Sequence, residues 1–219
     1  MSQGVVKLWL EIIPTSVPPE EIKVWDITPK DPYEIEVRIC VLNCKDIVMM
    51  DAEGTSDVFF KGYFDQKEEI QETDTHYRNQ DGKPDFQYRL VYKIHHPRKT
   101  NKFTLQAYDR DFFKSNDIIG EAQIDLEQII EDCSLIKAPV CLNKKYYEDV
   151  ILKNKPDSKM KFGTSDPNKF WLPMQAKKDG KIISNGEVRV QIDILPRDLA
   201  EKNPVGKARD QPNHSPQLP

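Results

Sequence analysis

Short runs in which apolar and polar residues alternate recur along the chain, and this pattern constrains the fold more than any other feature. In residues 34–41, Ile35, Val37, Ile39 and Val41 alternate with charged residues and a cysteine. A period of two places the apolar side chains on one face of a strand. Several such runs separated by turn residues predict an all-β fold in which antiparallel strands form a sandwich. The other runs are 58–64, 86–92, 103–108, 118–124, 170–174 and 188–194.

We expect a sandwich of eight strands between Glu34 and Leu195, seven of which are the runs given above. A further run at 5–13 predicts an extra N-terminal strand, which either pairs at an edge or replaces the last strand of a permuted sheet. Residues 125–133 break the alternation and predict one or two helical turns with Asp125 as the N-cap. The Lys-rich segment 134–169 predicts a long, partly ordered insertion before the penultimate strand. The expected domain is therefore 1–196, followed by a polar, Pro-rich tail or linker at 197–219.

Composition excludes several classes of protein. A net charge of −4 and a pI of about 5.7 argue against nucleic-acid binding. The chain has no apolar run of about 18 residues and no signal-peptide pattern, so we expect a soluble fragment with a cytosolic address. It has no G-x-S-x-G, H-E-x-x-H or P-loop motif, so we expect no enzyme.

We expect reduced thiols, because the spacing of the cysteines fits no zinc site. These cysteines are Cys40, Cys44, Cys133 and Cys141.

Five aspartates lie in two loops that connect predicted strands. Asp51 and Asp57 flank a glycine-containing turn, and Asp109, Asp111 and Asp117 lie in the second loop. A sandwich can bring two such loops to the same end, where the carboxylates would repel one another unless a cation lay among them. Calcium accepts six to eight oxygens in flexible geometry, whereas magnesium needs a stricter octahedron. The alternative is that each aspartate only stabilises its own turn.

Both loops resemble the calcium-binding loops of C2 domains. The resemblance rests on two segments, MDAEGTSDVFFKGYF (50–64) and LQAYDRDFFKSNDIIGEAQIDL (105–126). Together they fill all five acidic positions of that pattern. The proline that usually follows the second Asp is replaced by Val58. The resemblance implies a C2-type fold that binds two or three Ca²⁺ ions.

Three further segments resemble the last, membrane-proximal C2 domain of the ferlins. They are GVVKLWLEIIP (4–14), TDTHYRNQDGKPDFQYR (73–89) and EKNPVGKARDQP (201–212). The resemblance implies a fragment of a single-pass, tail-anchored protein on the cytoplasmic side of a vesicle or plasma membrane. Ferlins act in calcium-triggered vesicle fusion, including exocytosis, and in membrane repair. The resemblance does not place residues 134–169.

The expected function is calcium-dependent binding to anionic phospholipids such as phosphatidylserine. Bound calcium would make the acidic end attractive to lipid phosphates. Apolar side chains at the loop tips would then enter the membrane, or else pack beneath the loops. The expected membrane-contacting residues are Phe112, Phe113, Met49 and Met50.

A second surface could bind phosphoinositide headgroups, with an ordinary solvated face as the alternative. Its residues would be Arg89, Lys93, Arg98, Lys99 and Lys102. The competing function is a calcium-independent scaffold module that binds other proteins, with the fusion machinery as one class of partner.

Overall fold

The computed structural model describes residues 8, 10–22, 32–64, 69–156, 158, 160–178 and 180–206. Two compact units make up the chain, Met1–Asp31 and Pro32–Pro219. The described part of the first unit contains one 3₁₀ turn, η1 (Pro19–Glu21). Residues 10–13 form no strand there, and residues 5–7 and 9 of the predicted N-terminal strand lie outside the described residues.

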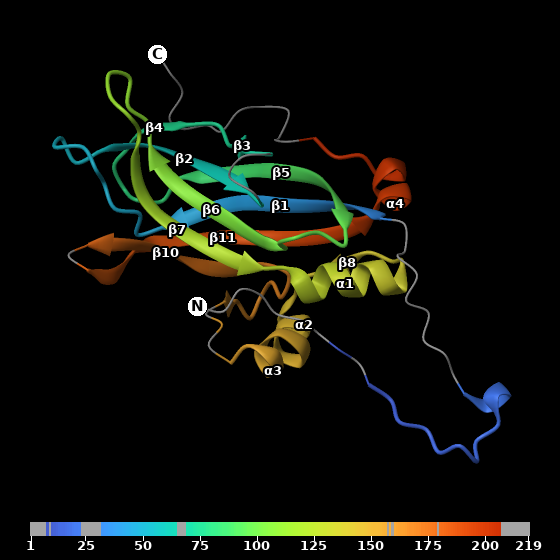
Figure 1. Cartoon of the computed structure of the whole chain (residues 1–219). Coiled ribbons are helices and arrows are strands. Elements are labelled where there is room, and N and C mark those ends of the chain that lie inside the picture. Colours follow the sequence, from blue (N-terminus) through green and yellow to red (C-terminus); the bar gives the residue numbers. More distant parts are fainter. Residues whose placement is uncertain are drawn as a thin grey trace. The chain divides into compact units, whose positions relative to one another are not determined.

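The second unit is built mainly from antiparallel strands, which confirms the predicted fold class (Figure 1). Its long strands correspond to the seven alternating runs, and the short ones border turns or the insertion. The long strands are β1 (Tyr33–Lys45), β2 (Ser56–Tyr63), β5 (Asp85–His96), β6 (Lys102–Asp109), β7 (Asp117–Asp125), β10 (Phe170–Lys178) and β11 (Lys181–Pro196). The short strands are β3 (Gln71–Glu72), β4 (His76–Asn79), β8 (Val140–Cys141) and β9 (Lys161–Phe162).

Eight strands follow one hydrogen-bonded order, β3-β2-β6-β7-β10-β11-β1-β5. The ladder between β7 and β10 consists of the single pair Glu121–Gln175, and the strands on either side of it form the two layers of the sandwich. Strand β1 pairs with β5 along one edge and with β11 along the other. The last strand, β11, thus lies beside the first strand, β1.

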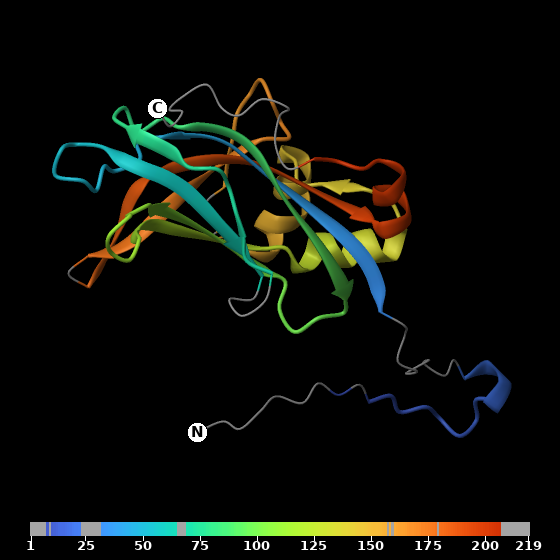
Figure 2. The same cartoon turned by 90° about the horizontal axis from the view of Figure 1, so that it is seen from above.

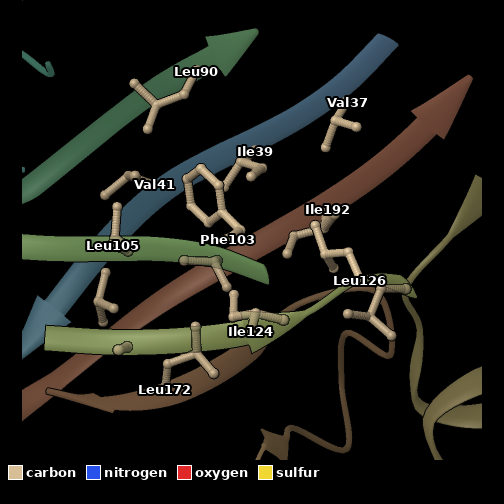
Figure 3. Packing of buried hydrophobic residues seen from close by; sticks show 14 of the residues in the cluster. Val37, Ile39, Val41, Leu90, Phe103, Leu105, Ile124, Leu126, Leu172 and Ile192 are labelled. Carbon is tan, nitrogen blue, oxygen red and sulfur yellow. The ribbon is translucent and has the colours of Figure 1, made fainter. Parts of the chain in front are cut away.

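The core lies between the two layers. Apolar side chains from β1, β5 and β11 point toward those from β6 and β7 (Figure 3). Ile39, Phe103 and Ile192 are completely buried. Alternation along β1 and β11 therefore supplies one wall of the core, as a period of two requires. All four cysteines are free.

Helices occupy the connections. The predicted helical stretch forms the ten-residue helix α1 (Glu127–Ile136), which is longer than one or two turns because Ile129, Ile130 and Cys133 continue its buried face. Asp125 lies one residue before the N-cap position, but its carboxylate accepts the Glu127 N–H at 3.0 Å. The insertion contains one helical stretch of three parts, α2 (Lys144–Tyr146), the π-helical η2 (Tyr147–Ile151) and α3 (Leu152–Asn154).

The chain after Pro196 differs from the expected polar tail. Residues Arg197–Lys202 form helix α4, and Ala200 is buried. Arg38 on β1 donates to Glu36 at 2.7 Å and to the Asn203 carbonyl at 2.7 Å. The charged face of β1 is therefore covered by α4 and the residues after it, which a local pattern of alternation does not predict.

Candidate functional site: the acidic loop end

Strand polarity brings the two aspartate-rich loops to one end of the sandwich. The 46–55 loop follows β1, and the 110–116 loop joins β6 to β7. Asp109 pairs in register with Val58 on one side and with Asp117 on the other, so the adjacent ends of β2, β6 and β7 all carry acidic residues. Both loops lie at the left-hand end of the domain in Figures 1 and 2.

Asp109 is the buried centre of the loop end, with 3% of its surface exposed. Its Oδ1 accepts the Asp57 N–H at 2.6 Å, and its Oδ2 accepts the Ser56 hydroxyl at 3.2 Å. Burial raises the pKa of the Asp109 carboxyl, and the hydrogen bond from the Asp57 N–H lowers it. The nearby charge of Asp51 raises the pKa further, so the net pKa lies above the ordinary value. A cation beside Asp109 would favour the charged form of this carboxyl, which burial disfavours.

Ser56 is a positioning residue that the sequence reasoning missed. It is fully buried, and its hydroxyl also accepts the Met50 N–H at 2.7 Å. It thus ties the 46–55 loop to Asp109. The only sequence signal for it is its place directly before Asp57 at the start of a strand.

Asp51 and Asp57 hold different parts of the loop end. Asp51 shapes the tip of the 46–55 loop, where its carbonyl accepts the Gly54 N–H at 3.0 Å and its carboxylate accepts the Thr55 hydroxyl at 3.2 Å. Asp57 accepts the Arg78 N–H at 2.7 Å, and its carbonyl accepts the Arg110 N–H at 2.9 Å. The backbone at Asp57 therefore connects the two loops directly.

Asp111 and Asp117 share a lysine. The Lys114 ammonium donates to Asp117 at 2.8 Å and lies 3.4 Å from Asp111 Oδ2. The hydrogen bond to Asp117, followed by the charge of Asp111, raises the pKa of Lys114 despite an opposing desolvation effect. Lys114 was not singled out from the sequence, although its spacing of three residues from both aspartates is a usable signal.

The donor chemistry of the loop end is suited to calcium. Asp111 Oδ2 is buried and accepts no hydrogen bond from the described residues, and its contact with the Lys114 ammonium is an ion pair at 3.4 Å. The Arg110 side chain turns away from the cluster and bonds to Thr75 at 2.8 Å and Glu72 at 3.1 Å. Carboxylate oxygens are the ligands that calcium prefers. Among the residues that the structure describes, however, no three acidic, histidine or cysteine side chains form a ready-made metal site.

The apolar residues at the loop tips differ in exposure. Phe113 is fully exposed, and Phe112 is 71% exposed and stacks on Tyr77 at a centroid distance of 6.4 Å. Met50 is 40% exposed, and so is its unpredicted neighbour Val48, at 41%. Met49 instead packs against the hydrophobic core, which differs from the expectation that both methionines face outward. Phe112, Phe113, Val48 and Met50 therefore form the apolar rim of the acidic end.

The five residues of the predicted headgroup surface lie on β5, in the turn after it and at the start of β6. Arg89 and Lys93 lie on β5, and Arg89 donates to the Gly206 carbonyl at 2.7 Å. Arg98 lies over the Phe64 ring at 4.8 Å and 3.8 Å from Glu69. Lys99 and Lys102 lie near the start of β6, at the end opposite the acidic loops. The five residues are therefore distributed along β5, the turn that follows it and the first residue of β6.

The comparisons with known proteins bear on the fold. Residues 35–138 match the family model described as "C2 domain". Together with the antiparallel strand order, this match defines a C2-type fold. The whole chain is similar to myoferlin, with 28% identity over 245 residues to the protein of Xenopus tropicalis and 28% over 250 residues to that of Homo sapiens. It covers 12% of each, so it spans about an eighth of the length of these relatives.

Two of the solved structures that match cover about three quarters of this chain. A C2 domain of plant Extended Synaptotagmin 1 has a TM-score of 0.48 and 14% identity, over 76% of this chain and 98% of that chain. Human GIVD cytosolic phospholipase A2 has a TM-score of 0.47 and 13% identity, over 75% of this chain and 17% of that chain. Within the described residues, no helix is long and apolar enough to cross a membrane.

Proposed function

We propose that this domain binds anionic phospholipid membranes through its acidic loop end in a calcium-dependent manner. The observation that carries the proposal is the buried Asp109 carboxylate, which lies among the aspartates of both loops, together with the exposed ring of Phe113 in the same loop end. A group of acidic oxygens favours a cation, and an exposed aromatic ring favours an apolar partner. A calcium-loaded loop end in contact with a bilayer satisfies both.

The residues that would hold calcium are the five aspartates of the two loops. When bound, calcium would supply positive charge to an end that otherwise repels anionic lipid. Hydrogen bonds from Ser56 and Asp57 hold the Asp109 carboxylate in place, so it would be a fixed ligand beside the other carboxylates. Phe112, Phe113, Val48 and Met50 would then enter the interfacial layer of the membrane.

The wider role follows from the similarity to myoferlin. We propose that the domain belongs to a ferlin-like, tail-anchored protein that acts in vesicle fusion or membrane repair at the cytoplasmic side of a membrane, and that it corresponds to the last, membrane-proximal C2 domain. Phosphatidylserine is the proposed main lipid, and phosphoinositides are further candidates.

The second candidate is a calcium-independent module that binds other proteins. It is favoured by Lys114, whose ammonium already contacts Asp111 and Asp117. A tethered cation of this kind partly neutralises the loop end without any metal ion. The two candidates differ in whether calcium binds at all.

Calorimetric titration with calcium distinguishes them, with and without vesicles that contain phosphatidylserine. We expect heat of binding from the wild type, tighter binding with anionic vesicles, and loss of both in Asp109→Asn/Asp111→Asn. The matched control is Glu131→Gln/Asp149→Asn, which removes two exposed carboxylates from helical segments outside the loops. An absence of calcium binding at millimolar concentration, with or without lipid, would favour the scaffold module.

A further inference from the structure

The hairpin between β10 and β11 carries a concentrated positive charge at its tip. Its sequence, KKDGKII (177–183), has three lysines and one aspartate around a glycine at φ +77°. Asp-Gly at the centre of a two-residue connection is a strong hairpin signal, because the glycine accepts the left-handed backbone. Lys177, Lys178 and Lys181 are exposed, and none of them forms an ion pair with another residue that the structure describes.

This hairpin belongs to the acidic loop end. Strand β10 runs antiparallel to β7, so its last residues lie where β7 begins. Asn185 near the hairpin base donates to the carbonyl of Ile119, the third residue of β7, at 2.7 Å. The hairpin and both loops lie at the same end of the domain in two perpendicular views (Figures 1 and 2).

A second contact attaches the base of the hairpin to the start of the 46–55 loop. Gly186 has φ +108°, and a Cβ at that position would lie 2.6 Å from the Asp46 carbonyl oxygen. Only glycine permits this backbone angle together with this close approach. The base of the hairpin is therefore attached to the start of β7 and to the 46–55 loop, so the hairpin is a fixed part of that end.

The tip also exposes an aliphatic side chain beside the lysines. Ile182 is 72% exposed and pairs across the hairpin with Lys177, and Lys178 pairs with Lys181. Paired residues on antiparallel strands project from the same face. One face thus combines an isoleucine with a long basic side chain, whose charged end can reach headgroups while its stem lies along acyl chains.

We propose that the β10–β11 hairpin is a second, calcium-independent membrane contact. Lys177, Lys178 and Lys181 bind anionic phospholipid headgroups, and Ile182 enters the interfacial layer. The partner is a bilayer because the basic tip shares one end of the domain with the apolar rim, so that a single flat, anionic surface can meet both. This inference rests on the proposed function, since that function turns this end of the domain toward the membrane.

The two contacts differ in what controls them. The acidic loops repel anionic lipid until a cation binds, whereas the hairpin lysines attract it at all calcium concentrations. The hairpin therefore holds the domain weakly at a membrane before calcium rises. Because this attraction is electrostatic and exposed, it decreases as the salt concentration increases.

The test is sedimentation of the 219-residue chain with phosphatidylcholine vesicles, with and without phosphatidylserine, first in a calcium chelator and then in calcium. In the chelator at low salt, we expect the wild type to bind the phosphatidylserine vesicles. We expect Lys177→Gln/Lys178→Gln/Lys181→Gln to bind at least about 10-fold more weakly, because each lysine near an anionic surface contributes substantially. The control Lys145→Gln/Lys153→Gln/Lys202→Gln removes the same charge from α2, α3 and α4 and should bind like the wild type.

Each outcome bears on one of the two ideas. If wild type shows no chelator-resistant binding, or the hairpin and control variants weaken equally, the hairpin contact is refuted, while calcium-stimulated binding can still be present. If calcium adds no binding but the chelator-resistant binding depends on the hairpin lysines, the hairpin contact stands and the calcium-dependent function fails. Asp109→Asn/Asp111→Asn should keep the chelator-resistant binding. Thermal unfolding of each variant establishes that it is folded.

Discussion

Lys114 lies three residues from both Asp111 and Asp117, and its ammonium contacts both carboxylates. Without a bound ion, the lysine offsets part of the repulsion within the 110–116 loop. A metal ion that uses these two aspartates has to displace it. At the scale of single residues, the affinity of the loop end for calcium therefore depends on a lysine as well as on the aspartates.

We expect Lys114→Ala to increase the affinity for calcium by about 2- to 5-fold, the range that corresponds to an exposed ion pair. Calorimetric titration measures this change. Lys83→Ala is the matched control, because it removes one exposed positive charge from the turn before β5 without breaking an ion pair with the described residues. An unchanged or weaker affinity in Lys114→Ala would show that the lysine does not compete with calcium.

At the scale of elements, Asp125 connects the end of β7 to two helices. Its carboxylate accepts the Glu127 N–H at the start of α1 and a hydrogen bond from Lys155, directly after α3. Leu126 at the N-cap position has no side chain that can cap the helix. Asp125 therefore acts as the cap from one position earlier.

We expect Asp125→Ala to lower the free energy of unfolding by about 1 kcal/mol, the usual effect of removing a capping side chain. Urea unfolding measures the change. Asp149→Ala, an exposed position in η2, should stay within about 0.5 kcal/mol of the wild type. Equal stabilities of the two variants would contradict the capping role.

The pH dependence of this effect has a defined sign. Burial raises the pKa of Asp125, but the hydrogen bonds from Lys155 and the Glu127 N–H lower it more, so the net pKa is below the ordinary value of 3.8. A lowered pKa in the folded state means that the stabilisation is present above pH 3.8 and is lost as the pH falls through the lowered pKa. The difference between wild type and Asp125→Ala should shrink in urea titrations below pH 3.8.

At the scale of the whole molecule, α4 and the residues after it complete the outer face of the β1 layer. Arg38 is only 8% exposed, and its guanidinium donates to Glu36 and to the Asn203 carbonyl. Arg89 likewise donates to the Gly206 carbonyl. Two arginines of neighbouring strands thus depend on a segment that is far away in the sequence.

We expect a chain that ends after Pro196 to be less stable than one that ends after Gly206, by about 1–3 kcal/mol. The shorter chain leaves Arg38 without its carbonyl acceptor, and hydrogen bonds to charged groups contribute in this range. Chemical unfolding of the two chains measures the difference. The chain ending after Gly206 should match the 219-residue chain, and equal stability of all three would place the end of the folded unit at Pro196.

Much of the fold could be predicted because its signals are local. The period of two in residues 34–41 and 188–194 depends only on which face of a strand each residue occupies, so it locates β1 and β11 directly. The two aspartate-rich loops were found for the same reason, since they lie between recognisable strands. Predicting α4 from its sequence was harder, because this short and mostly charged segment becomes ordered only by packing on β1.

The sequence by itself determined the strands, the turns between them, and the presence of acidic and aromatic residues in two of those turns. Only the tertiary structure decided that β11 lies beside β1, that Met49 turns inward, and that the KKDGKII hairpin stands at the same end as the acidic loops. The physical reason is that alternation and turn residues act over a few positions. Packing between residues far apart in the chain decides the strand order and which side chains are buried. It also decides which charged segments lie at the same end of the domain.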